Sequence, residues 1–312
     1  MFILASALAA IIPMVSYLIF IWKFDRYDRE PFKLVLQNYL WGSVGAILFA
    51  LLGSLIISEI LAQFISGEEE LDYLGSIITA PIVEEITKGI FLFITVKNKK
   101  FDNITDGIVY GGAIGLGFGM TENFLYFISF GVDISNWISI VLVRTLFSAV
   151  MHCVTTATFG AFLGYAKLKG SSNKNIIPLT GLIIAILIHF AWNFSVSLKS
   201  TALPGFLFMA VTIVIFIAMF SAAVFSERKI IFNELLSEVN SGTIPSTHLE
   251  HLCSPNRNSK GWIDENIRKT YLRASTTLAF KKNRLKNSQG DSKKFFEDEV
   301  SNYREFIKSL LA

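Results

Sequence analysis

Seven long apolar segments limit how this chain of 312 residues can fold. Each has the length of about 20 residues that a helix needs to cross the hydrocarbon core of a bilayer. They cover residues 1–22, 36–64, 71–96, 105–130, 137–166, 176–198 and 204–226. Hydrophobic residues make up 52% of the chain and the mean hydropathy is +0.51, which is typical of a polytopic membrane protein. The sequence therefore predicts an all-α protein with about seven transmembrane helices.

The charges in the connecting loops predict the orientation of these helices. The 23–34 loop holds four Lys or Arg residues, whereas the 65–70 loop holds only acidic charges. The loops at 97–104 and 167–175 are again rich in lysine. Because basic loops stay in the cytoplasm, we expect a cell-membrane protein with its N-terminus outside and its C-terminus inside. The first segment has no basic region before it, so we expect a retained helix and not a cleaved signal peptide.

The composition changes after residue 226. Residues 227–312 hold 15 Lys or Arg against 11 Asp or Glu and contain no further apolar span. We expect a transmembrane domain at 1–226 and a cytoplasmic helical region at 227–312. Within that region the sequence predicts a loop at 240–261, followed by helices at about 262–287 and 291–311.

Two polar features of the C-terminal region could suggest a site. His248, His251 and Cys253 do not match a strong zinc-binding spacing. The basic run at 281–286 would suit an anionic membrane surface. A solvated helix face is the simpler interpretation of that run, and we adopt it.

Charged residues in the middle of the 71–96 segment are the first sign of a functional site. They are Glu84, Glu85 and Lys88, and each such group at mid-depth costs about 2.5–3.5 kcal/mol on insertion scales. On a helix, Lys88 lies four residues from Glu84 and three from Glu85, so it can pair with either. We expect its partner to be Glu84 or a carboxylate of the 105–130 segment. Taken alone, these residues could also form a structural ion pair that holds two helices together.

Glycine recurs at every fourth position of the 105–130 segment, from Gly107 to Gly119. Small residues at this spacing let a neighbouring membrane helix approach closely. The ladder ends at Glu122 and Asn123, which add a carboxylate and an amide inside a predicted span. We expect the glycines to serve packing, and Glu122 and Asn123 to support a site.

Polar stripes with a spacing of four run along the next two segments. They consist of Arg144, Ser148, His152 and Thr156 in the first, and Ala185, His189, Asn193 and Ser197 in the second. At a rise of about 1.5 Å per residue, His152 and His189 lie near the middle of their segments, as the glutamates do. One histidine on an apolar helix is usually a core residue. Two at one depth, on different helices and beside two glutamates, indicate a site.

Peptide hydrolysis needs an activated water molecule, a stabilised oxyanion and a proton for the leaving amine. Paired carboxylates suit the first task, because two adjacent buried like charges do not readily both ionise. We assign catalytic roles to Glu84, Glu85, His152, His189 and Asn193. His189 and Asn193 are expected to point donors at the oxyanion, and His152 to hold the water or pass the proton. Lys88, Glu122, Asn123 and Arg144 are the expected supporting residues, with Arg144 paired to Glu122.

Together these motifs resemble the PrsW family of intramembrane proteases. EExxK, an Asp-Gly with a glycine-rich span ending in Glu-Asn, an Arg-to-His stripe and HxxWN occur in that order within residues 1–226. The related type II CAAX prenyl endopeptidases carry EExxxR and HxxxN, with a Phe where this chain has Ser148, so prenyl-protein processing is not expected. The resemblance implies a glutamic-type membrane protease, with Glu84 as the base and no obligatory metal or other cofactor.

The resemblance also implies which partners the protein has. The expected substrate is a single-pass membrane protein similar to an anti-sigma factor, cut near the outer face of the membrane in regulated proteolysis. The lipid bilayer is the other expected partner, and no nucleic acid is expected.

Three alternatives stay open at this point. An ion- or proton-coupled transporter also uses intramembrane ionisable residues, although the matched broken helices typical of transporters are missing. A non-catalytic scaffold could use the same polar layer to bind a membrane partner. A zinc protease could take Glu84, His152 and His189 as its three ligands, which is the number that a catalytic zinc site requires.

Overall fold

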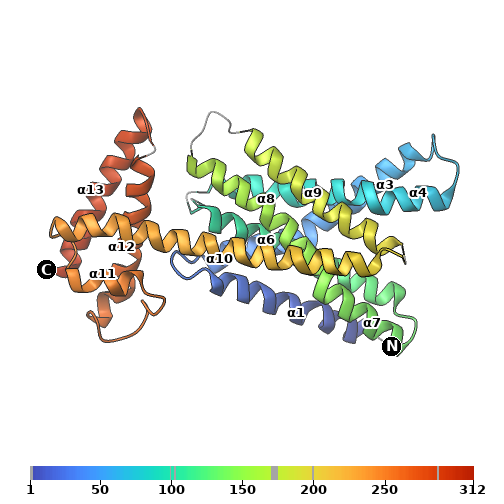
Figure 1. The fold of residues 1–312 in the computed structure, drawn as a ribbon, viewed down its shortest axis with the longest axis horizontal. Coiled ribbons are helices and arrows are strands. Elements are labelled where there is room, and N and C mark those ends of the chain that lie inside the picture. Colours follow the sequence, from blue (N-terminus) through green and yellow to red (C-terminus); the bar gives the residue numbers. More distant parts are fainter. Residues whose placement is uncertain (1–2, 99, 102, 170–174, 199, 287) are drawn as a thin grey trace. The chain divides into compact units, whose positions relative to one another are not determined.

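A computed structural model describes residues 3–98, 100–101, 103–169, 175–198, 200–286 and 288–312, and it contains only helices and their connections there (Figure 1). Lys99, Lys174 and Lys199, which belong to the predicted loops, lie outside these residues. The chain divides into two compact units. Unit 1 comprises Met1–Phe24 and Glu30–Phe220, and unit 2 comprises Asp25–Arg29 and Ser221–Ala312.

Unit 1 contains a helix at each predicted apolar segment. Its helices are α1 (Ile3–Phe24), α2 (Phe32–Leu40), α3 (Ile47–Leu61), α4 (Glu68–Leu74), α5 (Ala80–Thr95), α6 (Ile104–Phe130), α7 (Ile134–Val143), α8 (Ala149–Lys169), α9 (Ile176–Ser197) and the first part of α10 (Ala202–Asn240). Three π-helical turns join neighbouring helices, namely η1 (Trp41–Ala46), η2 (Gly75–Thr79) and η3 (Arg144–Ser148). Thus α2–α3, α4–α5 and α7–α8 each run on without a loop.

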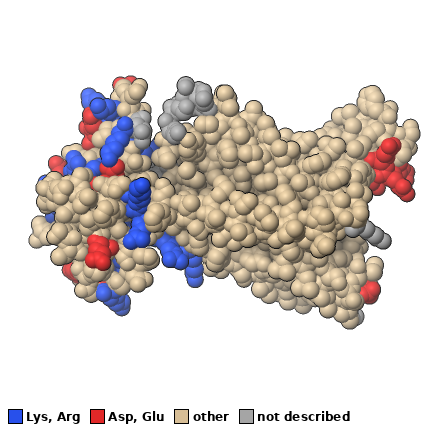
Figure 2. All heavy atoms as spheres, viewed as in Figure 1, with Lys and Arg blue, Asp and Glu red and all other residues tan. Residues whose placement is uncertain are grey.

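Within the residues that the structure describes, five helices are long and apolar enough to cross a membrane. They are Ile3–Phe24, Phe32–Leu61, Ile134–Leu168, Ile176–Ser197 and Ala202–Asn240. The helices at 68–95 and 104–130 are less apolar, because one carries the charged motif and the other the glycine ladder and further polar residues. The count of seven crossings therefore stays a prediction. Figure 2 shows the visible surface of the apolar helices as almost free of charged residues.

Helix α6 packs against α8, α1 and α2 and forms the centre of unit 1. The glycine ladder explains how close α6 and α8 come. A Cβ atom added at Gly107 would lie 1.9 Å from the Gly160 carbonyl oxygen, and one at Gly115 would lie 2.1 Å from that of His152. No side chain fits at either position, so the packing role predicted for these glycines is confirmed.

Unit 2 consists of the last part of α10 with α11 (Ser246–Cys253), α12 (Glu265–Lys286) and α13 (Asp291–Leu311). The prediction of a continuous loop at 240–261 was wrong, because α11 lies within it. The Ser, Pro and His residues around α11 favour a loop in a sequence-based prediction. The helix is stabilised by the buried side chains of Leu249 and Leu252. His248 and His251 pack against the Trp262 ring, with ring centroids 5.4 and 5.0 Å away, and not around a shared metal site.

The basic run at 281–286 is only partly a solvated face, which corrects the prediction, because Lys286 is exposed whereas Lys282 is not. Lys282 is buried and its Nζ lies 2.5 Å from a carboxylate oxygen of Glu238. Lys286 pairs with Glu234 at 2.5 Å. Both partners lie on α10, so these lysines join α12 to α10 through ion pairs. The periodicity of α12 alone could not reveal which of its faces α10 covers.

Candidate functional site

The charged motif lies at the start of α5. Proline at position 81 cannot donate a backbone hydrogen bond, and it lies in the first turn of α5, directly after the π-helical turn η2. The helix runs on from η2 into α5, so Pro81 removes a backbone hydrogen bond inside it, and π-helical turns are frequent at functional sites. Glu84, Glu85 and Lys88 follow on α5, and the side chains of Glu85 and Lys88 are 1% and 0% exposed.

The carboxylate of Glu85 is fully engaged by its neighbours. Its Oε1 lies 2.5 Å from Lys88 Nζ and 2.9 Å from His189 Nδ1. The Thr155 hydroxyl donates to the same oxygen at 3.0 Å, and the Thr156 hydroxyl reaches Oε2 at 3.4 Å. Helices α5, α8 and α9 therefore meet at one buried carboxylate.

Lys88 pairs with Glu85, not with Glu84 or a carboxylate on α6 as the sequence predicted. The spacing along the helix allowed either glutamate, and packing decides between them. The side chain of Glu85 points to the two threonine hydroxyls of α8, and Lys88 lies on this buried side of α5 as well. The Lys88 ammonium is also 3.1 Å from His152 Nδ1.

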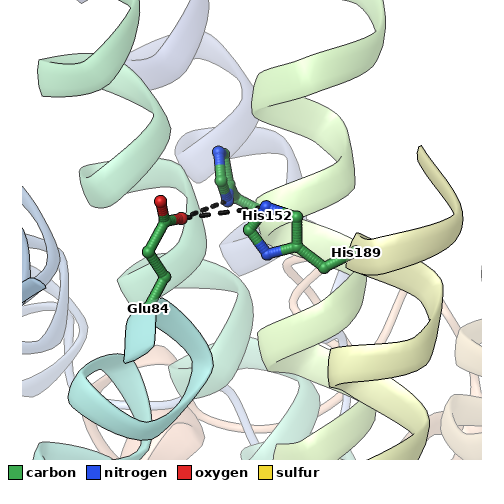
Figure 3. Close-up of side chains that lie close together, drawn as sticks. All are labelled: Glu84, His152 and His189. Carbon is green, nitrogen blue, oxygen red and sulfur yellow. Dashed lines mark ion pairs between the residues drawn. The ribbon is translucent and has the colours of Figure 1, made fainter. Parts of the chain in front are cut away.

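The Glu84 carboxylate faces both predicted histidines, His152 and His189 (Figure 3). It faces His189 at the ring nitrogen that Glu85 does not contact. Its Oε2 lies 3.8 Å from His189 Nε2 and 3.9 Å from His152 Nδ1. This oxygen is buried and has no hydrogen-bond donor among the described residues. One potential ligand atom from each of the three residues lies within 4.8 Å of the others. We call these three residues the Glu84 cluster.

A second carboxylate orients His152 from the opposite side of its ring. Glu122 on α6 lies 2.6 Å from His152 Nε2 and 2.7 Å from Arg144 Nη2. Arg144 also donates to Asn123 Oδ1 at 3.1 Å, and its guanidinium carbon lies 3.5 Å from the centre of the Tyr126 ring. The predicted pairing of Arg144 with Glu122 is therefore present.

Asn193 does not point to the Glu84 cluster, although the sequence placed it there. It lies one turn beyond His189 on α9, and its amide donates to the carbonyl oxygen of Ser76 at 2.9 Å. The contact is explained by η2, because that turn brings the Ser76 carbonyl to α9. The structure thus brings together Glu84, Glu85, Lys88, Glu122, Asn123, Arg144, His152 and His189, with Asn193 at the edge.

Thr155 is a residue of the site that the sequence did not reveal. Threonines on α8 are common, and Thr158 donates to a backbone carbonyl of its own helix. The sequence offers no signal that separates a threonine of that kind from one that contacts Glu85. Tyr126 was likewise not predicted, although its position one turn after Glu122 could have suggested it.

A cavity of about 410 Å³ adjoins the site. Glu84 and Glu122 both line it, together with Phe118 and Tyr126 of α6. The remaining lining residues come from α3 and from the α4–η2–α5 helix. Residues Glu84 and Glu122 of the site therefore lie at the boundary of this cavity.

The comparison with known proteins identifies the family. A family profile described as PrsW family intramembrane metalloprotease matches residues 30–221, which include every residue of the site. The chain belongs to this family. Membership supports a membrane-embedded protease as its function and agrees with the multi-pass helical fold. Most of unit 2 lies outside the matched region.

Curated relatives of the family agree with this assignment. The chain is 27% identical to Protease PrsW of Bacillus subtilis (strain 168) over 216 residues, which is 68% of this chain and 90% of that protein. It is 31% identical to Protease PrsW of Clostridioides difficile (strain 630) over 189 residues, which is 60% of this chain and 77% of that protein. No solved structure matches the chain.

Proposed function

We propose that this protein is an endopeptidase that cuts a peptide bond of a membrane protein at the Glu84 cluster. The observation that carries the proposal is the environment of Glu84 Oε2. This oxygen has no hydrogen-bond donor among the described residues and faces a nitrogen of His152 and of His189, and the Glu84 residue lines the cavity. A buried oxygen without a hydrogen-bond partner costs folding free energy. We therefore infer that a further group binds beside Glu84 Oε2.

The Glu84 cluster fits a divalent metal ion such as zinc. Two imidazoles and one carboxylate are a common catalytic ligand set for zinc. The second ring nitrogen of each histidine is held by a carboxylate, His152 by Glu122 and His189 by Glu85. Outer carboxylates of this kind orient histidine ligands in metal sites. Zinc in such a site supplies a Lewis acid and a water molecule of lowered pKa.

The residues around the cluster hold its members in position. Glu85 accepts hydrogen bonds on both oxygens, so it is not available as a base, and it fixes the ring of His189 with Nε2 towards Glu84. Lys88 balances the charge of Glu85. Glu122 fixes the ring of His152 in the same way and takes its own counter-charge from Arg144.

A glutamic mechanism without metal is the second candidate, and one contact favours it. The Lys88 ammonium lies 3.1 Å from His152 Nδ1, the nitrogen that would otherwise bind the ion. In this mechanism Glu84 takes a proton from a water molecule held between the two imidazoles. Because His189 Nδ1 already donates to Glu85, Nε2 can donate to the oxyanion only when the ring is an imidazolium, and Asn193 joins it only after leaving the Ser76 carbonyl.

Metal analysis separates the two mechanisms. Purified protein in detergent would be analysed for zinc and assayed on a membrane-protein substrate with and without a chelator. About one zinc per chain, lost together with activity on chelation and regained with added zinc, supports the metal site. Full activity in metal-free protein supports Glu84 as a base. His152→Ala should lower zinc content in the first case, and Thr158→Ala, on the same helix but outside the cluster, serves as the control.

The finer features of substrate and topology are also proposals. The substrate is a single-pass membrane protein similar to an anti-sigma factor.

The chain crosses the membrane seven times, with its N-terminus outside and residues 227–312 in the cytoplasm. A reporter that is fluorescent only in the cytoplasm should be bright when fused after residue 230 and dark when inserted in the 65–70 loop. The reverse pattern would contradict this topology.

A further inference from the structure

The cavity beside Glu84 is a long groove with two different walls. One wall is a single face of α3 that runs from Ile47 to Leu61, and the other runs from Leu71 to Glu84 along α4, η2 and α5. Each wall covers about 20 Å at the rise of a helix. Helix α6 forms the floor at the end where Glu84 lies. The groove therefore leads from the loop between α3 and α4 to the Glu84 cluster.

Most of the groove is apolar, but the end that lies farthest from Glu84, here called its outer end, is acidic. Asp72 lines the groove near its outer end. Glu68 and Glu69 precede Asp72 by four and three residues on α4, so they lie on the same face of that helix. They are exposed, and Figure 2 shows acidic side chains gathered at this end of unit 1.

No Lys or Arg residue on the helices that form the walls of the groove offsets these acidic charges at its outer end. The sequence contains no Lys or Arg between Lys33 and Lys88, a stretch that includes both walls of the groove. Lys88 is buried against Glu85 at the opposite end. A peptide lying in the groove thus meets mainly apolar surface, interrupted by the hydroxyls of Ser54, Ser58, Ser76 and Thr79, and negative charge at one end. Charge complementarity of this kind selects between partners more than it adds affinity.

We propose that this groove binds the substrate as an apolar segment with Lys or Arg residues at one end. The basic end lies against Glu68, Glu69 and Asp72, and the apolar part lies against α3. The bond to be cut then lies beside Glu84. This inference rests on the proposed peptidase function and names the substrate feature that the same site recognises.

The dimensions of the groove fix the spacing between these two features. Asp72 and Glu84 are twelve residues apart along a continuous helix, which corresponds to about 18 Å. A peptide in extended form covers about 3.3 Å per residue. The basic residues should therefore lie about five or six residues from the scissile bond.

Cross-linking in a catalytically impaired protein tests the groove without requiring cleavage. The protein would carry Glu84→Gln and be reconstituted in vesicles of neutral phosphatidylcholine. The probe is a synthetic peptide with an apolar 20-residue segment, a photoreactive residue and, six positions from it, three lysines, three glutamates or three serines. We expect the lysine peptide to cross-link to α3 or α5 about tenfold more than the glutamate peptide at low salt, with a smaller difference at high salt.

Charge reversal supplies the decisive comparison. Glu68→Lys, Glu69→Lys and Asp72→Lys together should reverse the preference towards the glutamate peptide. The matched control reverses three exposed acids of α13, with Glu297→Lys, Asp298→Lys and Glu305→Lys, and should keep the lysine preference. Equal cross-linking of the three peptides, or a preference that the α4 changes leave intact, would overturn the inference.

The result is independent of whether the protein is a peptidase. Preferential cross-linking combined with no cleavage by the unmodified protein would keep the groove and reject the proposed function. Cleavage of lysine- and glutamate-flanked peptides at equal rates would keep the proposed function and reject the groove inference.

Discussion

At the scale of single residues, adjacent glutamates on α5 have different environments. Glu85 is held by four donors, whereas Glu84 Oε2 has no hydrogen-bond donor among the described residues. The sequence predicted the pair and both histidines, because ionisable groups at one depth in apolar helices are rare. The sequence could not show which of Glu84 and Glu85 is the one held by hydrogen bonds, because that depends on which face of α5 packs against α8. The same limit explains the errors over Lys88 and Asn193.

The two glutamates should differ in their effect on stability. Glu85→Gln leaves the ammonium of Lys88 buried without its counter-charge, and breaking a buried ion pair costs about 3–5 kcal/mol. Glu84→Gln should cost little in metal-free protein, because no hydrogen-bond donor depends on its Oε2. Thermal unfolding in detergent with a chelator measures both variants. Equal losses of Tm would contradict the division of roles.

Among the helical elements of the described residues, two π-helical turns position site residues and a third packs on α6. Turn η2 precedes the glutamates and offers the Ser76 carbonyl to Asn193, and η3 contains Arg144. Turn η1 packs so closely on α6 that a Cβ at Gly42 would lie 2.0 Å from the Ile114 carbonyl oxygen. The sequence predicted the helices, because apolar runs of this length form helices in membranes. It did not predict these turns, since an unbroken apolar run is compatible with either helical form.

The glycine ladder gives a prediction at this scale. Gly115→Ala would force α6 and α8 apart at the His152 backbone, where no space exists for a methyl group. We expect a clear loss of thermal stability together with loss of cleavage, because His152 would move. Gly75→Ala is the control for stability, since a Cβ there meets no atom within 4 Å and alanine favours a helix. Unchanged stability in Gly115→Ala would show that the two helices tolerate a wider spacing.

For the molecule as a whole, the sequence predicted an all-helical fold. Its composition changes after residue 226, close to Ser221, where the C-terminal part of unit 2 begins. The sequence did not predict that residues 25–29 join the C-terminal helices in unit 2. Arg257 makes this connection, because its buried guanidinium donates to the Tyr27 carbonyl at 3.0 Å and also to the Leu272 carbonyl and the Thr276 hydroxyl. Burial lowers the pKa of Arg257. Contacts between residues 230 positions apart leave no periodic signal in the sequence.

Loss of the Arg257 contacts should release the 25–29 segment. Hydrogen bonds to a charged group contribute about 1.5–3 kcal/mol each. Arg257→Gln should therefore speed trypsin cleavage after Arg26 or Arg29 by about tenfold or more in detergent-solubilised protein. The control is Arg273→Gln, because Arg273 is exposed on α12. Identical cleavage rates in the two variants would show that Arg257 does not hold this segment.

Whether the Glu84 cluster hydrolyses peptide bonds can be decided by a cleavage assay on one isosteric variant. Unmodified protein and Glu84→Gln would be reconstituted with the same single-pass membrane substrate, and the rate of product formation measured by mass spectrometry. Glutamine keeps the shape of the side chain but can neither accept a proton as a base nor supply an anionic metal ligand. We predict that Glu84→Gln folds and inserts normally while cleavage falls to background. Cleavage at the full rate by this variant would show that Glu84 is not required for hydrolysis.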